Sequence, residues 1–155
     1  MRAGVMLAAG AAVVSGLVLG LPAVAQDASL SPSFANLSLS SGFVPDPATV
    51  ELVAGGSIDA SRLGNGCNGM IANAPDVKLS WRNDGGSRLT IMAVSGGDTT
   101  LVINMPDGSW LCDDDSGGDL DPAVVIRNAP SGVYDIWVGT LGDGDGRALL
   151  SISEL

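Results

Sequence analysis

Short runs of apolar and β-branched residues, separated by Gly, Asn, Asp and Pro, recur about every eight to twelve positions from residue 45 onward. Several runs alternate apolar and polar positions, as half-buried strands do, and none has the period of an amphipathic helix. They predict an all-β fold, an antiparallel jelly-roll-like β-sandwich of about eight to nine strands. The predicted strands cover residues 49–53, 57–60, 77–82, 88–95, 99–104, 109–112, 123–127, 133–138 and 148–152.

One of these strands, near the end of the chain, shows its two faces clearly. Tyr134, Ile136 and Val138 share one face, while Asp135 and Trp137 share the opposite face. We expect the first set to point into the core. We also expect the 3 tryptophans of the chain to pack inside the fold rather than to form ligand platforms.

The first residues have the pattern of a secretory leader. Arg2 precedes an apolar run of about 17 residues, and Ala23, Val24 and Ala25 form a small-x-small cleavage motif. We predict a signal peptide over residues 1–25, a flexible N-terminal segment over 26–44 and the sandwich domain over 45–155. A retained anchor or a lipoprotein is the alternative, although no cysteine follows the run to accept a lipid. The predicted localisation is periplasmic or secreted.

Acidic residues dominate the charge, with 17 Asp and Glu against 7 Lys and Arg, and Arg2 leaves with the leader. An acidic surface repels nucleic acid and anionic membranes. No second apolar stretch is long enough to span a bilayer. We therefore expect no nucleic-acid partner and, after leader removal, no membrane. The remaining partner class is an unknown protein or glycan in the envelope or outside the cell.

The chain contains 2 cysteines, Cys67 and Cys112. In an oxidising compartment an isolated pair indicates one disulfide. Closing a loop of 45 positions would stabilise the fold by about 4 kcal/mol in the loop-entropy model. Two free thiols are the alternative, and a zinc site is disfavoured because the chain has no histidine and no second cysteine pair.

The absence of histidine also restricts catalysis. Ser-His-Asp and Cys-His arrangements need an imidazole base, which this chain does not have. Lys78 is the single lysine and lies in an alternating strand, and only Glu51 and Glu154 join the aspartates as acids. A glycosidase would need two carboxylates at a defined separation, which sequence cannot establish. We predict that the protein is not an enzyme and keep a secreted hydrolase as the weakest alternative.

The segment from Asp113 to Asp121 carries five carboxylates, the densest acidic stretch of the chain. Their mutual repulsion is relieved by solvent or by a hard cation, and calcium takes six to eight oxygen ligands. The spacing resembles the start of an EF-hand loop, but the twelfth position is Val124 instead of a bidentate Glu. Any calcium site would therefore take ligands from several loops. The candidate ligands are Asp98, Asp113, Asp114, Asp115 and Asp119; a solvated acidic turn is the alternative.

Four motifs follow one another in a recognisable order: the Asp98-Thr99 strand, the turn at residues 106–108, the Asp stretch 113–115 and the Gly132-Val133-Tyr134 strand. This order resembles the bacterial pre-peptidase C-terminal domain family over roughly residues 75 to 153. The resemblance implies a jelly-roll-like sandwich that accompanies exported enzymes without being catalytic. Related collagen-binding modules use calcium, which implies Asp98 and Asp113 to Asp115 as ligands.

Two functions fit these observations best. The first is an exported non-catalytic binding or accessory module, stabilised by calcium. The second is a metal-free structural or envelope-interaction protein.

Overall fold

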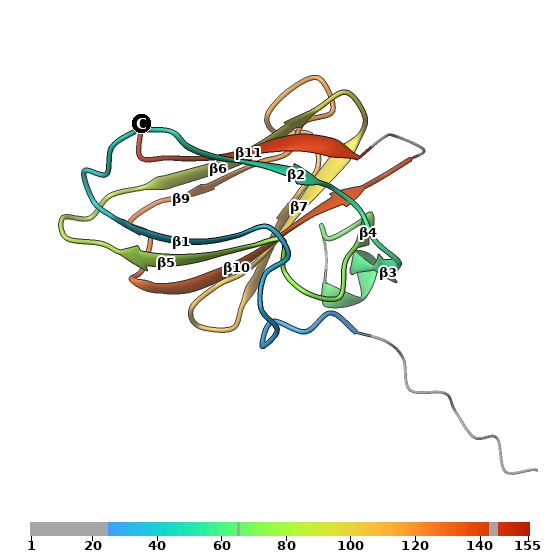
Figure 1. Cartoon of the computed structure of the whole chain (residues 1–155), viewed down its shortest axis with the longest axis horizontal. Helices are drawn as coiled ribbons and strands as arrows, with labels where there is room; N and C mark the ends of the chain where they lie inside the picture. Colours follow the sequence, from blue (N-terminus) through green and yellow to red (C-terminus); the bar gives the residue numbers. More distant parts are fainter. Residues whose placement is uncertain (1–24, 65, 143–145) are drawn as a thin grey trace, which may run out of the picture.

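The computed structural model describes residues 25–64, 66–142 and 146–155, which form two β-sheets packed face to face (Figure 1). The seven-stranded sheet contains β1 (Ala35–Ser40), β3 (Ile58–Asp59), β4 (Met70–Ile71), β5 (Val77–Arg82), β7 (Thr99–Asn104), β8 (Trp110–Asp113) and β10 (Gly132–Thr140). The four-stranded sheet has the order β2 (Ala48–Val53), β11 (Arg147–Ser153), β6 (Leu89–Ser95) and β9 (Ala123–Ile126). The predicted β-sandwich is confirmed. Residues 1–24 of the predicted signal peptide lie outside the described residues.

Strand β10 organises the larger sheet. Its first half pairs with β5 and its last residue, Thr140, with β4, while β7 pairs with its second half and in turn with β8. The edge strands of the two sheets are joined by two of the connections between the sheets: residues 41–47 lead from β1 to β2, and residues 114–122 lead from β8 to β9. The sandwich therefore has one side bounded by β1 and β2 and another bounded by β8 and β9.

The main core lies between the sheets and follows the period-two pattern of the strands. Tyr134, Ile136 and Val138 of β10 are buried there, as predicted from their alternation. The Tyr134 hydroxyl donates to the Pro130 carbonyl at 2.6 Å, so the polar end of this core residue is satisfied. Leu150 and Ile152 of β11 contribute the facing layer.

A second apolar cluster lies on the outer face of the larger sheet. Trp137 and Val102 point outward from β10 and β7, yet both are fully buried. Residues 57–64 and 66–72, which we call the cover segment, lie over them; this segment contains β3, the 3₁₀ turn η1 (Ala60–Leu63) and β4. Within the described residues no helix is long and apolar enough to cross a membrane.

The N-terminal segment 26–44, which we expected to be flexible, contributes β1 to the sheet. β1 pairs with β5 in parallel, whereas all other strand pairs of the described structure are antiparallel. The preceding residues are also held, because Lys78 Nζ donates to the Ala28 carbonyl at 2.9 Å and Ser33 N to the Pro75 carbonyl at 2.8 Å. The Ser- and Asn-rich sequence has low β-propensity, and burial of Leu37 and Leu39 against the core overrides it.

Candidate functional site

The disulfide predicted from the two cysteines is present and ties the cover segment to the larger sheet. Cys67 in the cover segment bonds to Cys112 in β8, with 4.9 Å between their Cα atoms. We call residues 113–121 the acidic loop, and the bond brings Asn68 of the cover segment close to its first residues. A disulfide of this kind indicates an oxidising, extracytoplasmic compartment.

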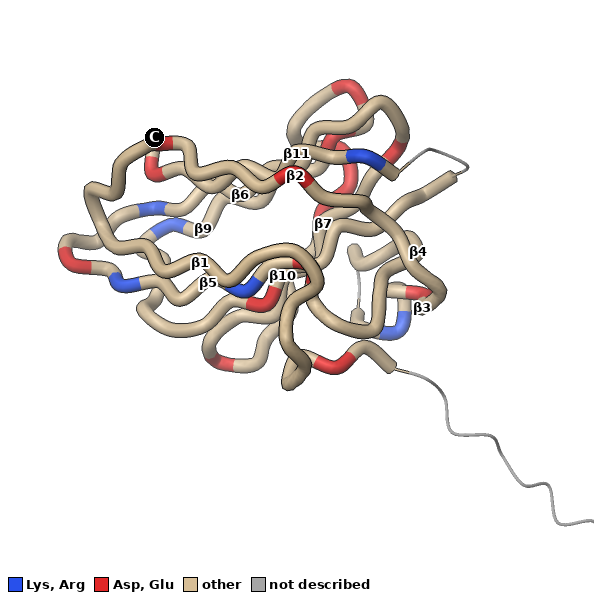
Figure 2. Tube along the Cα trace, in the orientation of Figure 1, with Lys and Arg blue, Asp and Glu red and all other residues tan. Residues whose placement is uncertain are grey.

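The acidic loop lies at one end of the sandwich, against the turn between β6 and β7, and Figure 2 shows acidic positions gathered along it. Ser95 N donates to the Asp121 carboxylate at 3.1 Å, and Thr99 N donates to the Leu120 carbonyl at 3.4 Å. The turn is held from the other side too, since Leu141 N donates to the Asp98 carbonyl at 3.0 Å. We call this meeting of the two loops and the cover segment the acidic corner.

The Asp113 side chain closes its own loop. Its carboxylate accepts from Ser116 N at 2.9 Å, from the Ser116 hydroxyl at 2.5 Å and from Ala123 N at 2.8 Å. Because Asp113 ends β8 and Ala123 begins β9, this carboxylate links the last residue of a strand in the larger sheet to the first residue of a strand in the smaller sheet. Hydrogen bonds of N–H and O–H groups to a carboxylate are strong, so Asp113 stabilises the loop directly.

The Asp114 side chain points to the cover segment. Its carboxylate accepts from the Asn68 amide at 2.8 Å. The Thr100 hydroxyl lies 3.3 Å from the Asn68 side-chain oxygen and 3.0 Å from the Asp113 carbonyl. The neighbourhood therefore holds amide, hydroxyl and carbonyl oxygens as well as carboxylates, and all of these oxygens are suitable ligands for a hard metal ion.

Carboxylates crowd one another at this corner. The pKa of Asp115 is raised by partial loss of solvation and then by the charges of Asp114, Asp98 and Asp113. One oxygen of Asp98 is buried and has no hydrogen-bond partner within the described structure. The charges of Asp98, Asp113 and Asp114 thus act on Asp115, and one carboxylate oxygen of Asp98 stays buried without a partner.

Asp119, the fifth predicted ligand, is placed differently. It is exposed, has a left-handed backbone with φ of 54°, and is not among the carboxylates that shift the pKa of Asp115. Asp121 was not predicted as a site residue, but it is buried and bonds across to Ser95. Asn68 was also missed, although its position next to Cys67 could have indicated it.

A preformed metal cage is not visible. Among the described residues no group of three or more His, Cys, Asp or Glu side chains has the geometry to hold a metal ion. The donors that remain for an ion are the unpartnered Asp98 oxygen, the carboxylates of Asp114 and Asp115, and the Asn68 side-chain oxygen. Their chemistry fits calcium, because all are oxygen ligands on adjacent loops.

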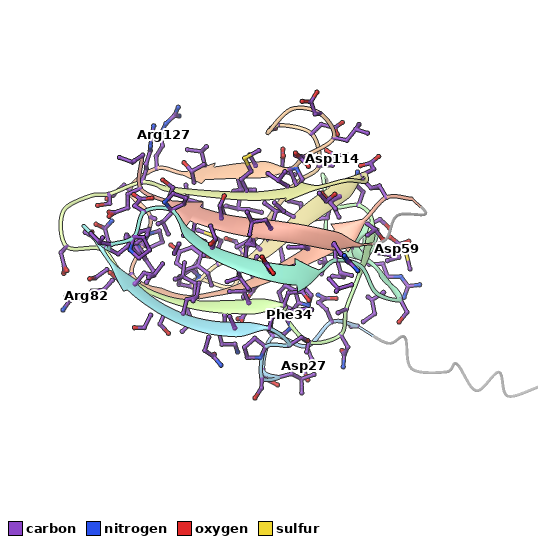
Figure 3. The ribbon with its side chains drawn as sticks, turned by 45° about the horizontal axis from the view of Figure 1, so that its top comes forward. Asp27, Phe34, Asp59, Arg82, Asp114 and Arg127 are labelled. Atoms are coloured by element: carbon purple, nitrogen blue, oxygen red, sulfur yellow. A yellow bond between two sulfur atoms is a disulfide. The ribbon has the colours of Figure 1, made fainter. Side chains whose placement is uncertain are left out.

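A second surface of interest is an open groove of about 740 Å³ that extends from Phe34 across the ends of β2 and β11 to the end of β6. The ends of β2, β6 and β11 form one wall, and Phe34 at the start of β1 forms the other. Its lining includes Phe34, Val53 and Leu149, which are 43%, 55% and 42% exposed. Figure 3 shows Phe34 on the side where β1 and β2 lie, away from Asp114 at the acidic corner.

No protein-family model, curated protein or solved structure matches the chain.

Proposed function

We propose that the protein is an exported, non-catalytic binding or accessory module of the pre-peptidase C-terminal type, and that its acidic corner binds calcium. The observation that carries the proposal is the buried, unpartnered Asp98 oxygen next to the crowded carboxylates of Asp114 and Asp115. A buried acceptor without a donor costs free energy, and a divalent cation would satisfy it and reduce the repulsion.

Calcium would act here on the segments that form the acidic corner. Asp98 belongs to the β6–β7 turn, Asp114 and Asp115 to the β8–β9 connection, and Asn68 to the cover segment. An ion held between them would fix three separate segments relative to one another. The recognition surface for a protein or glycan partner would then be preorganised, which lowers the entropy lost on binding.

The first experiment is a thermal melt of the mature protein in calcium after chelator treatment. A ligand at a hundred times its Kd stabilises the folded state by about 2.7 kcal/mol. For a domain of this size that corresponds to a rise in Tm of roughly 10 °C. We expect this rise in the unsubstituted protein and its loss in Asp98→Asn and Asp115→Asn.

Asp84→Asn is the matched control, because Asp84 is an exposed acid in the turn after β5 and its removal changes the net charge equally. Its calcium response should equal that of the unsubstituted protein. An identical response in all variants would mean that calcium acts on the net charge and not on the acidic corner.

The second candidate is a metal-free structural or envelope-interaction protein, and one feature favours it. The carboxylates of Asp113, Asp114 and Asp121 already accept hydrogen bonds that hold the loop. If this function is correct, calcium will leave Tm unchanged, and capture of the envelope partner will survive addition of chelator.

A further inference from the structure

Strand β1 has an open edge. It pairs with β5 alone among the described strands. Ala35 N and Ser41 N donate to β5-side carbonyls, those of Asp76 and Arg82, so the N–H and C=O groups of every second residue point toward β5. The backbone groups of Asn36, Ser38 and Ser40 therefore point away from it. We call these outward groups the β1 edge.

The β1 edge lacks the usual protection of an exposed strand. Natural edges carry charged side chains, proline or bulges that prevent pairing with another chain. β1 spans 6 residues and contains neither a charged residue nor a proline. Residues 28–45 carry no charge at all, in a chain with 17 acidic residues. Two copies of this acidic protein would repel each other elsewhere, but not along this stretch.

We propose that β1 pairs antiparallel with β1 of a second copy, with the two-fold axis at Ser38. In this register Ser38 faces Ser38 of the second copy, and Asn36 faces Ser40 in both directions. These are the residues whose backbone groups are free, so the pairing makes about six N–H···O=C bonds. A two-fold interface is self-complementary, as this pairing of one edge with itself requires.

The side chains of the two strands match in the same register. Leu37 lies opposite Leu39 of the second copy, on the face that points into the sandwich. Both leucines are only partly buried in the single copy, so pairing would cover their remaining apolar surface. On the outer face, Ser38, Asn36 and Ser40 form polar cross-strand pairs without like charges.

The register also gives a reason for the exposure of Val44, the most exposed large apolar residue among the described residues. Val44 is 91% exposed and belongs to the connection from β1 to β2. Pairing places Gly42 of the second copy opposite Phe34. Because residues 41–47 cross from the larger sheet to the smaller one, the residues after Gly42 in the second copy pass Phe34 in the direction of β2. The open groove of about 740 Å³ begins at Phe34 and extends to β2. Val44 of each copy is therefore seated in the groove of the other.

The direct test is a cysteine placed on the two-fold axis. In Ser38→Cys the two Cα atoms would lie about 5.5 Å apart, a distance that a disulfide spans. The native cysteines are bonded to each other and do not compete. We expect a covalent dimer under oxidising conditions. In Asn36→Cys the two introduced residues would lie about 13 Å apart, and no such dimer should form.

Mass in solution tests the same contact without a covalent bond. Sedimentation of the mature protein should show a dimer that dissociates on dilution. Ser38→Lys and Ser38→Glu should each be monomeric, because like charges would meet at the axis, and an equimolar mixture should recover the dimer. Thr49→Lys on β2, an edge strand of the smaller sheet, is the control and should remain dimeric.

Two results would overturn the proposal. One is a monomer at every concentration, including a result in which β1 captures an extended segment of another protein but not a second copy. The other is a dimer whose mass is unaffected by both Ser38 substitutions. Circular dichroism of each variant, expected to match the unsubstituted protein, separates loss of pairing from loss of the fold.

Discussion

At the scale of single residues, the Asp76 side chain accepts a hydrogen bond from a backbone N–H of β10 that neither β4 nor β5 pairs with. It lies directly before β5 and is 1% exposed. Its carboxylate accepts from Val138 N at 2.8 Å, at a point of β10 between the residues paired with β5 and the residue paired with β4. Its backbone donates to Ile136 and accepts from Phe34. Three segments therefore meet at this residue.

The same position perturbs its ionisation. Burial raises the pKa of Asp76 to about 7, although the hydrogen bond from Val138 lowers it in part. A raised pKa means that the folded state prefers the protonated acid. Its stabilising contribution is complete below the unfolded pKa near 3.8, falls as the pH rises toward 7, and is lost above that value.

Asp76→Asn should therefore stabilise the protein at pH 8, because an amide oxygen still accepts from Val138 and no charge is buried. We expect a gain of about 2–4 kcal/mol at pH 8 and little change near pH 4, measured by urea unfolding at both values. Asp84→Asn should show no such pH-dependent gain. A loss of stability at pH 8 would mean that the charged form is favoured in the fold.

At the scale of elements, the cover segment depends on its disulfide more than on its strands. β3 and β4 are 2 residues long each, and one of them pairs with β10 through a single residue pair. Its apolar contacts with Trp137 and the bond to Cys112 hold it in place. Trp110 and Trp137, 5.6 Å apart between ring centroids, lie beneath and beside it.

Replacing both cysteines by serine should destabilise the protein by about 4 kcal/mol, the loop-closure value for this separation. Unfolding of this variant should begin at the cover segment. Its backbone amides should therefore exchange hydrogen faster than in the unsubstituted protein, while the amides of β10 remain protected. The intrinsic tryptophan emission should shift to the red as Trp137 becomes solvated. Equal exchange rates in both regions would show that the disulfide stabilises the whole fold and not this segment.

At the scale of the whole molecule, the folded unit is larger than the predicted domain. The expected boundary at residue 45 omits β1, yet Leu37 and Leu39 pack against the same core as Leu79 and Trp81 of β5. β1 is also an edge strand of the larger sheet, next to β5. Its removal would leave β5, a strand with three buried side chains, as the new edge.

A chain that begins at residue 45 should therefore aggregate or unfold, since burial of each leucine contributes about 1.5–3 kcal/mol and the parallel ladder would also be lost. A chain that begins at residue 34 should fold with reduced stability, because it lacks the Lys78 bond to Ala28. Solubility and thermal melting of the two chains test this order. Equal stability would show that β1 is dispensable.

The sequence by itself determined the β class, β2, the strands from β5 to β11 and the inward face of β10, because these depend on local alternation and on turn residues. It also determined the disulfide, since two cysteines allow one pairing. Only the tertiary structure decided that β1 joins the sheet, that Asn68 reaches Asp114, and that Asp76 bonds β10. These outcomes depend on packing between distant segments, which overrides weak local propensity and has no signature in neighbouring residues.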